Sequence, residues 1–180
     1  MSLSKHVFGV TGPSGSGKTQ LCQKIVGEAI ELGYDVAGFV SPAIFSEETK
    51  IAINVKILPS GKEKALAILA QNDMVNNVYG KWKFDQKAID LIQNHFLAIK
   101  HCDMLIVDEI GPLEIDQGKG WHKVLQHIDQ IDFSILVLTF REKYKAYFKN
   151  KFTNITIVDL NDSNDVLKFQ QSFQIFLDKQ

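Results

Sequence analysis

One short glycine-rich segment constrains the fold of this chain more than any other feature. Residues 12–19 read Gly-Pro-Ser-Gly-Ser-Gly-Lys-Thr, which fits the pattern of a glycine, four residues, and then Gly-Lys-Ser or Gly-Lys-Thr. The apolar residues 7–10 before it are strand-like, and a helix-period segment follows it. Glycines allow successive backbone N–H groups to converge on phosphate oxygens at a helix N-terminus. The segment therefore predicts a phosphate-binding loop, or P-loop, between a buried strand and a helix.

The residues of this loop have individual predicted roles. The predicted nucleotide-binding residues are Gly12, Pro13, Ser14, Gly15, Ser16, Gly17, Lys18, Thr19 and Gln20. Lys18 is also predicted to be catalytic, because its ammonium would reach the β- and γ-phosphates, and the Thr19 hydroxyl would bind Mg²⁺. A chance match to the pattern is expected in roughly one chain of this length in a hundred. Phosphate binding is therefore favoured over a flexible Gly/Ser loop that merely caps a helix.

A second candidate site lies at the end of a later apolar segment. Residues 104–107 are apolar and are followed by Asp108 and Glu109. A carboxylate in this position could hold Mg²⁺, directly or through water, and we assign that role to Asp108. The neighbouring carboxylate could orient and deprotonate a water molecule, so Glu109 is the candidate general base. Alone, the pair would indicate two solvated acids, but a P-loop in the same chain favours the functional interpretation.

Short apolar segments alternate with helix-period segments along most of the chain. Buried strands are predicted at residues 7–10, 36–40, 104–107, 135–138 and 155–158. Helices are predicted at residues 18–32, after an N-cap at Asp85, and at residues 163–177. This alternation is typical of a three-layer α/β fold, in which helices cover both faces of a mostly parallel sheet.

Two segments need separate interpretation. The helix after Asp85 has a predicted core-facing stripe consisting of Ala88, Leu91, Ile92, His95, Phe96 and Ile99, which makes His95 a packed or edge histidine. Residues 41–69 break the α/β rhythm, because apolar and other residues alternate from 51 to 57 before the turn at 59–61. We predict that this segment adds a β-hairpin or edge strands to the sheet.

The charge balance and the termini narrow the class of protein. Twenty basic and twenty-one acidic residues give a net charge of -1, which argues against nucleic acid as the main partner. Residues 1–5 are too short and polar for a signal peptide, and no apolar run approaches the ~18 residues that span a bilayer. We therefore expect one cytoplasmic P-loop domain over residues 1–180 with no membrane association. The sequence leaves its oligomeric state open.

The residues around the acidic pair resemble those of a known family. Residues 107–114 read Val-Asp-Glu-Ile-Gly-Pro-Leu-Glu, which is similar to the metal-binding region of the cancer-related nucleoside-triphosphatases, also called thermophilic-type nucleoside-triphosphate phosphatases. The resemblance extends to Gly38-Phe39, the alternating segment near Lys50, Phe84-Asp85, and residues 118–121. It thus covers most of the chain.

The resemblance implies a P-loop NTPase fold of the RecA-like or kinase-related type. It also implies slow, Mg²⁺-dependent hydrolysis of ATP, GTP and other triphosphates to the diphosphate, with low base specificity. By position, residues 12–19 would bind phosphates, Asp108 would serve the metal, and Glu109 would activate water. Glu114 belongs to the matching string but receives no catalytic assignment, because a helix-capping or loop-bracing carboxylate is an equally good interpretation. Where family members often carry hairpin arginines, this chain has Phe45 and Lys50.

The chain contains a single arginine, Arg141, just after the apolar segment 135–138. Ligands gather at the carboxyl ends of parallel strands, which favours an arginine finger that stabilises charge during catalysis. A lone arginine at a helix start is equally compatible with a surface residue. A nearby basic run, consisting of Lys143, Lys145, Lys149 and Lys151, favours a solvated helix face over a phosphate- or RNA-binding surface.

Two other functions use the same motifs. A nucleoside or small-molecule kinase transfers the phosphoryl group to an acceptor hydroxyl instead of water, and its acceptor pocket could lie in residues 41–69. A nucleotide-dependent switch with slow hydrolysis could use residues 111–120 as its moving part. Dedicated GTP recognition is disfavoured, because the base-reading string Asn-Lys-x-Asp is absent.

Overall fold

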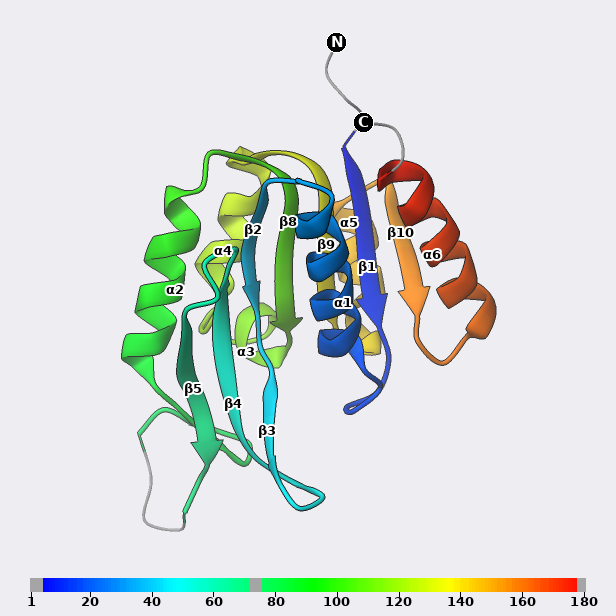
Figure 1. Cartoon of the computed structure of the whole chain (residues 1–180). Coiled ribbons are helices and arrows are strands. Elements are labelled where there is room, and N and C mark those ends of the chain that lie inside the picture. The colour runs from blue at the N-terminus through cyan, green and yellow to red at the C-terminus, as the bar shows by residue number, and fades with distance from the viewer. Residues whose placement is uncertain (1–4, 72–75, 178–180) are drawn as a thin grey trace.

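A β-sheet forms the middle of the protein (Figure 1). The computed structural model describes residues 5–71 and 76–177. One half of the sheet is parallel and consists of β1 (His6–Thr11), β2 (Val36–Val40), β8 (His101–Ile110), β9 (Asp132–Phe140) and β10 (Ile155–Asp159). Its strand order is β10-β1-β9-β8-β2. These elements confirm the five strands predicted from apolar segments.

The other half of the sheet is antiparallel. It begins where β2 pairs with β4, and it consists of β3 (Ala43–Ser46), β4 (Thr49–Leu58), β5 (Glu63–Leu69), β6 (Val78–Tyr79) and β7 (Trp82–Phe84). The strand additions predicted for residues 41–69 are therefore confirmed, with the turn between β4 and β5. In Figure 1 the tip of β3 and β4 extends past the ends of the parallel strands.

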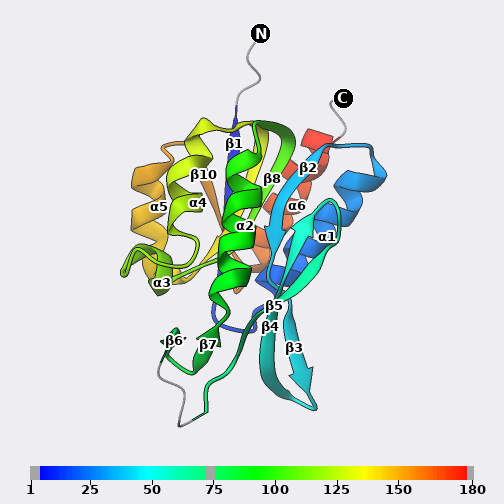
Figure 2. The same cartoon turned by 90° about the vertical axis from the view of Figure 1, so that its left-hand side faces the viewer.

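Helices cover both faces of the sheet, as Figure 2 shows edge-on. One face carries α1 (Lys18–Glu31) and α6 (Ser163–Leu177), and the other carries α2 (Gln86–Ala98), α4 (His122–His127) and α5 (Lys145–Lys151). A short α3 (Pro112–Ile115) and two 3-10 turns, η1 (Ile128–Gln130) and η2 (Glu142–Tyr144), complete the described elements. The predicted three-layer α/β fold is thus confirmed. No helix in the described ranges has the length and apolar character to cross a membrane.

The predicted core stripe of α2 is wrong at two positions. Ala88, Ile92 and Phe96 are buried at a spacing of four residues, whereas Leu91 is 45% exposed and His95 is also exposed. Ile89 and Gln93 are buried beside them, so the stripe that contacts the sheet is rotated away from the predicted one. Leu91 and His95 lie on the flank of that stripe.

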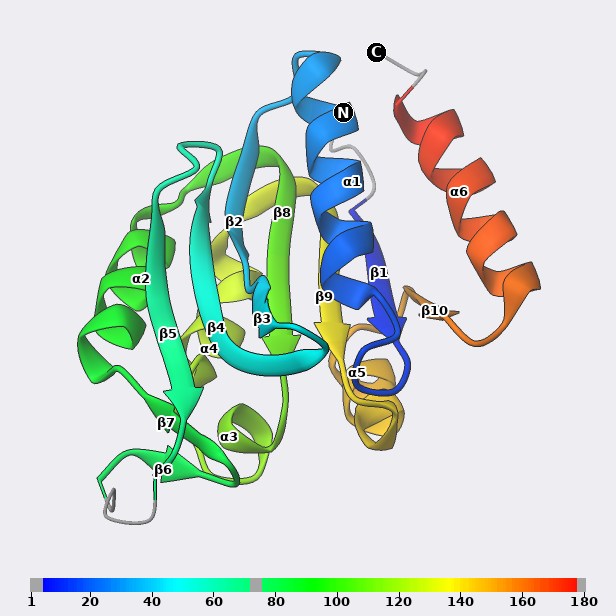
Figure 3. The ribbon, with the colours of Figure 1, turned by 60° about the horizontal axis from the view of Figure 1, so that its bottom comes forward.

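The parallel strands bring the predicted site residues to one edge of the sheet. The P-loop follows β1, Asp108 and Glu109 lie near the end of β8, and Arg141 directly follows β9. All parallel strands end at the same edge, and ligands of open α/β sheets bind there. Figure 3 shows the loop after β1 and the end of β9 next to each other at this edge.

Candidate active site

The P-loop backbone has the left-handed conformations that its glycines predict. The φ angles are 147° at Gly12, 82° at Gly15 and 90° at Gly17, which is the N-cap of α1. A side chain at Gly12 would also place its Cβ 2.7 Å from the Ser16 hydroxyl oxygen. Residues other than glycine rarely adopt these angles, so the spacing of the glycines is a requirement of the loop's shape.

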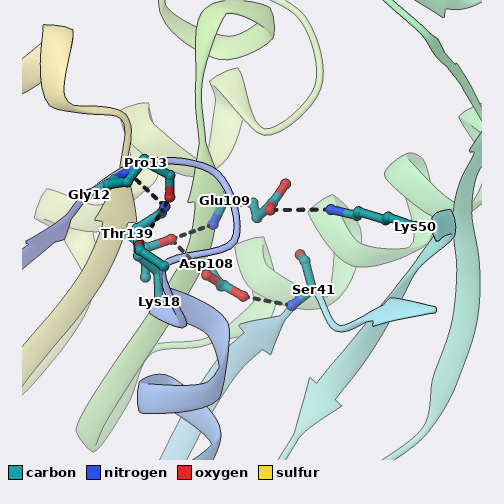
Figure 4. Close-up of polar contacts among 9 residues, drawn as sticks. Gly12, Pro13, Lys18, Ser41, Lys50, Asp108, Glu109 and Thr139 are labelled. Atoms are coloured by element: carbon teal, nitrogen blue, oxygen red, sulfur yellow. Dashed lines mark hydrogen bonds and ion pairs between the residues drawn. The ribbon is translucent and has the colours of Figure 1, made fainter. Parts of the chain in front are cut away.

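Lys18 lies against the same loop. Its ammonium donates hydrogen bonds to the carbonyl oxygens of Gly12, at 2.9 Å, and Pro13, at 2.7 Å (Figure 4). Burial lowers the pKa of Lys18, and the negative charges of Glu109 and Asp108 oppose that shift. The structure thus brings the predicted P-loop lysine within electrostatic range of both predicted carboxylates. Thr19 and Gln20 occupy the first turn of α1.

Asp108 is completely buried at the end of β8. One carboxylate oxygen accepts a hydrogen bond from the Thr139 hydroxyl at 2.6 Å, and the other accepts one from the backbone N–H of Ser41 at 2.9 Å. Three strands therefore meet at this carboxylate, because Thr139 belongs to β9 and Ser41 follows β2. Each oxygen has a second lone pair, so both can still accept a further bond or bind a cation.

A β-bulge explains how two consecutive acids both reach the site. The register between β8 and β9 shifts between Val107 and Ile110, and Glu109 has a φ of 66°. A bulge re-aims the side chain of its extra residue. The Thr139 hydroxyl stabilises this bend, because it accepts a 2.8 Å hydrogen bond from the Glu109 N–H while it donates to Asp108. Asp108 consequently points into the protein, and Glu109 points toward Lys50 (Figure 4).

The Glu109 carboxylate lies in a recess that keeps 42% of its side chain exposed. Its Oε1 is 3.9 Å from the ammonium of Lys50 on β4. Burial raises the pKa of Glu109, and the charge of Asp108 raises it further, while Lys50, Lys18 and Arg141 oppose the shift. A carboxylate with a raised pKa that still meets solvent accepts a proton more readily than an ordinary glutamate.

Glu114 braces the loop after the acidic pair. Its Oε2 accepts a 2.9 Å hydrogen bond from the N–H of Gly111, and its Oε1 accepts one from the N–H of Trp121 at 3.1 Å. The two interpretations left open for this residue, cap and brace, therefore both apply. Gly120 has a φ of 52°, and a Cβ there would collide with Glu114 Oε1 and Leu113. These contacts explain why a glycine and an acid occur together in this segment.

Glu114 gives the folded protein a proton-linked stability. Burial raises its pKa from the ordinary 4.5 to about 7, against the opposing hydrogen bonds from Gly111 and Trp121. Between these two pKa values the folded state binds a proton that the unfolded chain has lost. The stability contributed by this proton is therefore complete below pH 4.5 and is lost as the pH rises through 7. We expect the unfolding free energy of the wild type, relative to Glu114→Gln, to fall by about 3 kcal/mol across this window.

Urea denaturation of both proteins at a series of pH values measures this difference. Glu48→Gln, at an exposed position on the β3–β4 turn, serves as the matched control. A difference between wild type and Glu114→Gln that does not change with pH would contradict the raised pKa.

A cleft of about 500 Å³ opens beside Glu109. Its lining includes Ser14 and Lys18 from the P-loop, Lys50 from β4, Trp82 from β7, and Arg141 after β9. The guanidinium of Arg141 lies over Gly111. The structure therefore brings the predicted residues Lys18, Glu109 and Arg141 to one cleft.

Three of the four lysines in the basic run near Arg141 are paired with carboxylates. Lys143 contacts Asp116 at 3.1 Å, Lys145 contacts Asp159 at 2.9 Å, and Lys151 contacts Asp129 at 2.9 Å. These ion pairs are consistent with a solvated surface.

Comparison with known proteins assigns the chain to a family. A sequence model described as NTPase matches residues 7–169. The chain belongs to the NTPase family. That match confirms the predicted family resemblance and the prediction of a nucleoside-triphosphatase.

Individual relatives agree with this assignment. The nucleoside-triphosphatase THEP1 of Methanocaldococcus jannaschii is 28% identical over 79% of this chain and 82% of its own length. The nucleoside-triphosphatase THEP1 of Methanopyrus kandleri is 28% identical over 92% of this chain and 86% of its own length. The solution structure of a human cancer-related nucleoside triphosphatase covers 98% of this chain and 100% of its own, with a TM-score of 0.72 at 19% identity, and shows the same fold.

This NTPase contains three site residues whose roles the sequence did not reveal. Thr139 and Ser41 hold Asp108, and Lys50 contacts Glu109. The signal for the first two was a polar residue at the end of a buried parallel strand, the same signal that identified Asp108. Of the two hairpin residues singled out from the sequence, Lys50 supplies a cation to the cleft, whereas Phe45 is 59% exposed.

Proposed function

We propose that this NTPase hydrolyses the γ-phosphate of nucleoside triphosphates in a Mg²⁺-dependent reaction that yields the diphosphate and phosphate. One observation carries the proposal: the β8 bulge turns Glu109 into the cleft that Lys18 also lines. A proton acceptor and a phosphate-binding cation thus flank the same space. The family match over residues 7–169 also supports one P-loop domain.

The residues around Asp108 are suited to Mg²⁺. Mg²⁺ prefers oxygen ligands and is usually held by one or two carboxylates together with substrate phosphates. Asp108 supplies the buried carboxylate, and Thr19 is the proposed hydroxyl ligand. The Ser41 hydroxyl is also buried and has no hydrogen-bond partner in the described part of the protein, although its backbone binds Asp108. When bound, the metal would neutralise charge on the β- and γ-phosphates.

The chain's own side chains would carry the proton and the remaining charge. Glu109 would take a proton from the attacking water, for which its raised pKa makes it a stronger base than an ordinary glutamate. Lys18 would exchange its bonds to the Gly12 and Pro13 carbonyls for bonds to the β- and γ-phosphates. Desolvation of this region would strengthen both interactions.

The substrate range is proposed to be broad. The cleft meets the P-loop at Ser14 and Lys18, where the γ-phosphate would bind. The cleft residues would therefore not contact the base of the triphosphate. The brace at Glu114 ties Gly111 to Trp121, which argues against residues 111–120 as a freely moving switch. Location in the cytoplasm and the absence of a nucleic-acid partner stay predictions.

Arg141 provides a separate test of the catalytic arrangement. Arg141 is exposed, but it lines the cleft, and this position favours the arginine-finger interpretation. We expect Arg141→Ala to lower turnover by up to ~10³-fold with little change in nucleotide affinity. Arg141→Lys keeps the charge without the planar guanidinium and should retain intermediate activity. Near-normal turnover of the alanine variant would make Arg141 a surface residue.

A nucleotide panel tests the proposed function. Phosphate release from ATP, GTP, CTP and UTP is measured with Mg²⁺ and with excess chelator. We expect comparable rates for all four triphosphates and loss of activity on chelation. Activity that persists in chelator would contradict the roles given to Asp108 and Thr19, and strong preference for one base would contradict the broad range.

A further inference from the structure

The cleft beside Glu109 continues beyond the place proposed for the γ-phosphate. Of loop residues 12–20, all of which the structure describes, Ser14 and Lys18 alone line it. Its other walls include the antiparallel strands and α3. If the P-loop binds a triphosphate as proposed above, the cleft extends from the γ-phosphate away from the α-phosphate and the nucleoside. The following inference rests on that proposed function.

The far wall of this cleft is aromatic. Tyr79 on β6 and Trp82 on β7 are directly opposite each other in the antiparallel ladder, and both are half-buried. Phe84 and Trp121 also line the cleft, and Trp121 is only 3% exposed. Neighbouring aromatic side chains that remain partly open are suited to stack on a planar ring.

The cleft is also cationic. The charged side chains that line it are Lys18, Lys50, Lys81 and Arg141 against Glu109 and Glu114. The ammonium groups of Lys50 and Lys81 lie 5.3 Å and 5.4 Å from the centre of the Trp82 ring. Lys50 also contacts Glu109, so it connects the aromatic wall to the proposed base. A positive lining around an aromatic wall favours a ligand that combines a planar ring with negative charge.

We propose that this cleft binds a second substrate, a nucleoside monophosphate or a similar ring-bearing anion, and presents a hydroxyl group of that substrate to the γ-phosphate of the triphosphate. The hydroxyl oxygen bonds to the γ-phosphorus as the bond to the β–γ bridging oxygen breaks. The diphosphate leaves with that electron pair, and the hydroxyl proton passes to Glu109. Water is the acceptor when the cleft holds no such molecule. A volume of about 500 Å³ falls within the range of small-molecule sites.

Binding is tested by isothermal titration calorimetry on the full chain, with the P-loop first filled by Mg²⁺ and a non-hydrolysable ATP analogue. The probes are AMP, GMP, CMP and UMP, with adenosine as the ring without charge and ribose 5-phosphate as the charge without ring. We expect a nucleoside monophosphate to bind more tightly than either partial probe. Trp82→Ala should weaken the binding of the nucleoside monophosphate by about tenfold or more. Tyr147→Ala, which removes an exposed aromatic ring on α5, should leave the affinity for the nucleoside monophosphate unchanged.

Two results would overturn the proposed site. One is that no nucleoside monophosphate binds while the analogue fills the P-loop. The other is that Trp82→Ala weakens the analogue and not the monophosphate, which would place the triphosphate's own base in the cleft. If ATP hydrolysis is unimpaired when either result is found, the second-substrate site is rejected and the proposed hydrolytic function is not. Wild-type analogue binding and hydrolysis in Lys18→Ala would instead reject the proposed function.

Transfer is tested with ATP labelled at the γ-phosphate and the monophosphate that binds most tightly. Label should appear in the acceptor with the wild type and disappear from it with Glu109→Gln. Label found in inorganic phosphate alone would contradict the transfer step.

Discussion

Replacing Lys18 with alanine is expected to weaken ATP binding by about 10- to 150-fold, because a charge-assisted bond to phosphate contributes ~1.5–3 kcal/mol. Turnover of the remaining complex should fall by about 10²–10³-fold, since a positioned donor to developing charge is lost. Calorimetry with a non-hydrolysable analogue measures the first effect, and phosphate release at saturating ATP measures the second.

The fold should survive this substitution. Lys18 is half-buried and its side-chain bonds go to loop carbonyls of Gly12 and Pro13 rather than into the core. Lys24→Ala is the matched control, because Lys24 lies on the same helix with 62% of its side chain exposed and pairs only with Glu28 at 3.8 Å among the described ion pairs. An Lys18→Ala protein that binds ATP like the Lys24→Ala protein would remove the P-loop lysine from the proposed site.

Glu109→Gln is expected to produce a protein that binds triphosphate but hydrolyses it ~10²–10⁴-fold more slowly. Glutamine preserves the size of the side chain, but its amide is too weak a base to accept a proton from water. The lost ion pair with Lys50 spans 3.9 Å at a partly exposed position, and exposed pairs contribute only about 0–1 kcal/mol to stability. Single-turnover phosphate release isolates the chemical step from nucleotide affinity.

Asp108→Asn separates the two neighbouring acids. Thr139 and Ser41 donate to different oxygens of Asp108, so the amide oxygen can keep only one of these hydrogen bonds, and the negative charge that attracts Mg²⁺ is lost. Its activity should therefore require more Mg²⁺, whereas Glu109→Gln should keep the wild-type Mg²⁺ dependence. Wild-type single-turnover rates in Glu109→Gln would place water activation on another group.

The sequence specified the architecture through local periodicity. Apolar spacing predicted the five parallel strands and the helices α1 and α6, because each element must bury one face or stripe. The bounds predicted for α6, 163–177, are those observed. Leu91 and His95 were placed in the core stripe of α2, but Ile89 and Gln93 are buried instead, because spacing alone does not define how the helix is rotated against the sheet. The alternation at residues 51–57 predicted added strands within residues 41–69, but it predicted neither β6 and β7 nor the joining of β4 to β2, which depends on tertiary pairing.

The candidate site was predictable where a motif fixes local geometry, and not where separate strands combine. Residues 12–19 and the acidic pair are contiguous, so sequence alone identified them. The bulge that turns Glu109 toward Lys50 depends on the register between β8 and β9, which no local pattern encodes. Thr139 likewise acquires its role because its hydroxyl reaches both Asp108 and the Glu109 N–H from another strand.

Hydrolysis of Mg²⁺·ATP in water enriched in oxygen-18 tests the central claim most directly. If Glu109 directs water at the γ-phosphorus, the heavy oxygen should appear in the released phosphate and be absent from the ADP, as mass spectrometry of both products would show. Heavy oxygen in the ADP would mean that water attacks the β-phosphorus, and unlabelled phosphate would mean that another group attacks the γ-phosphorus. Either outcome would contradict the hydrolytic mechanism proposed for this site.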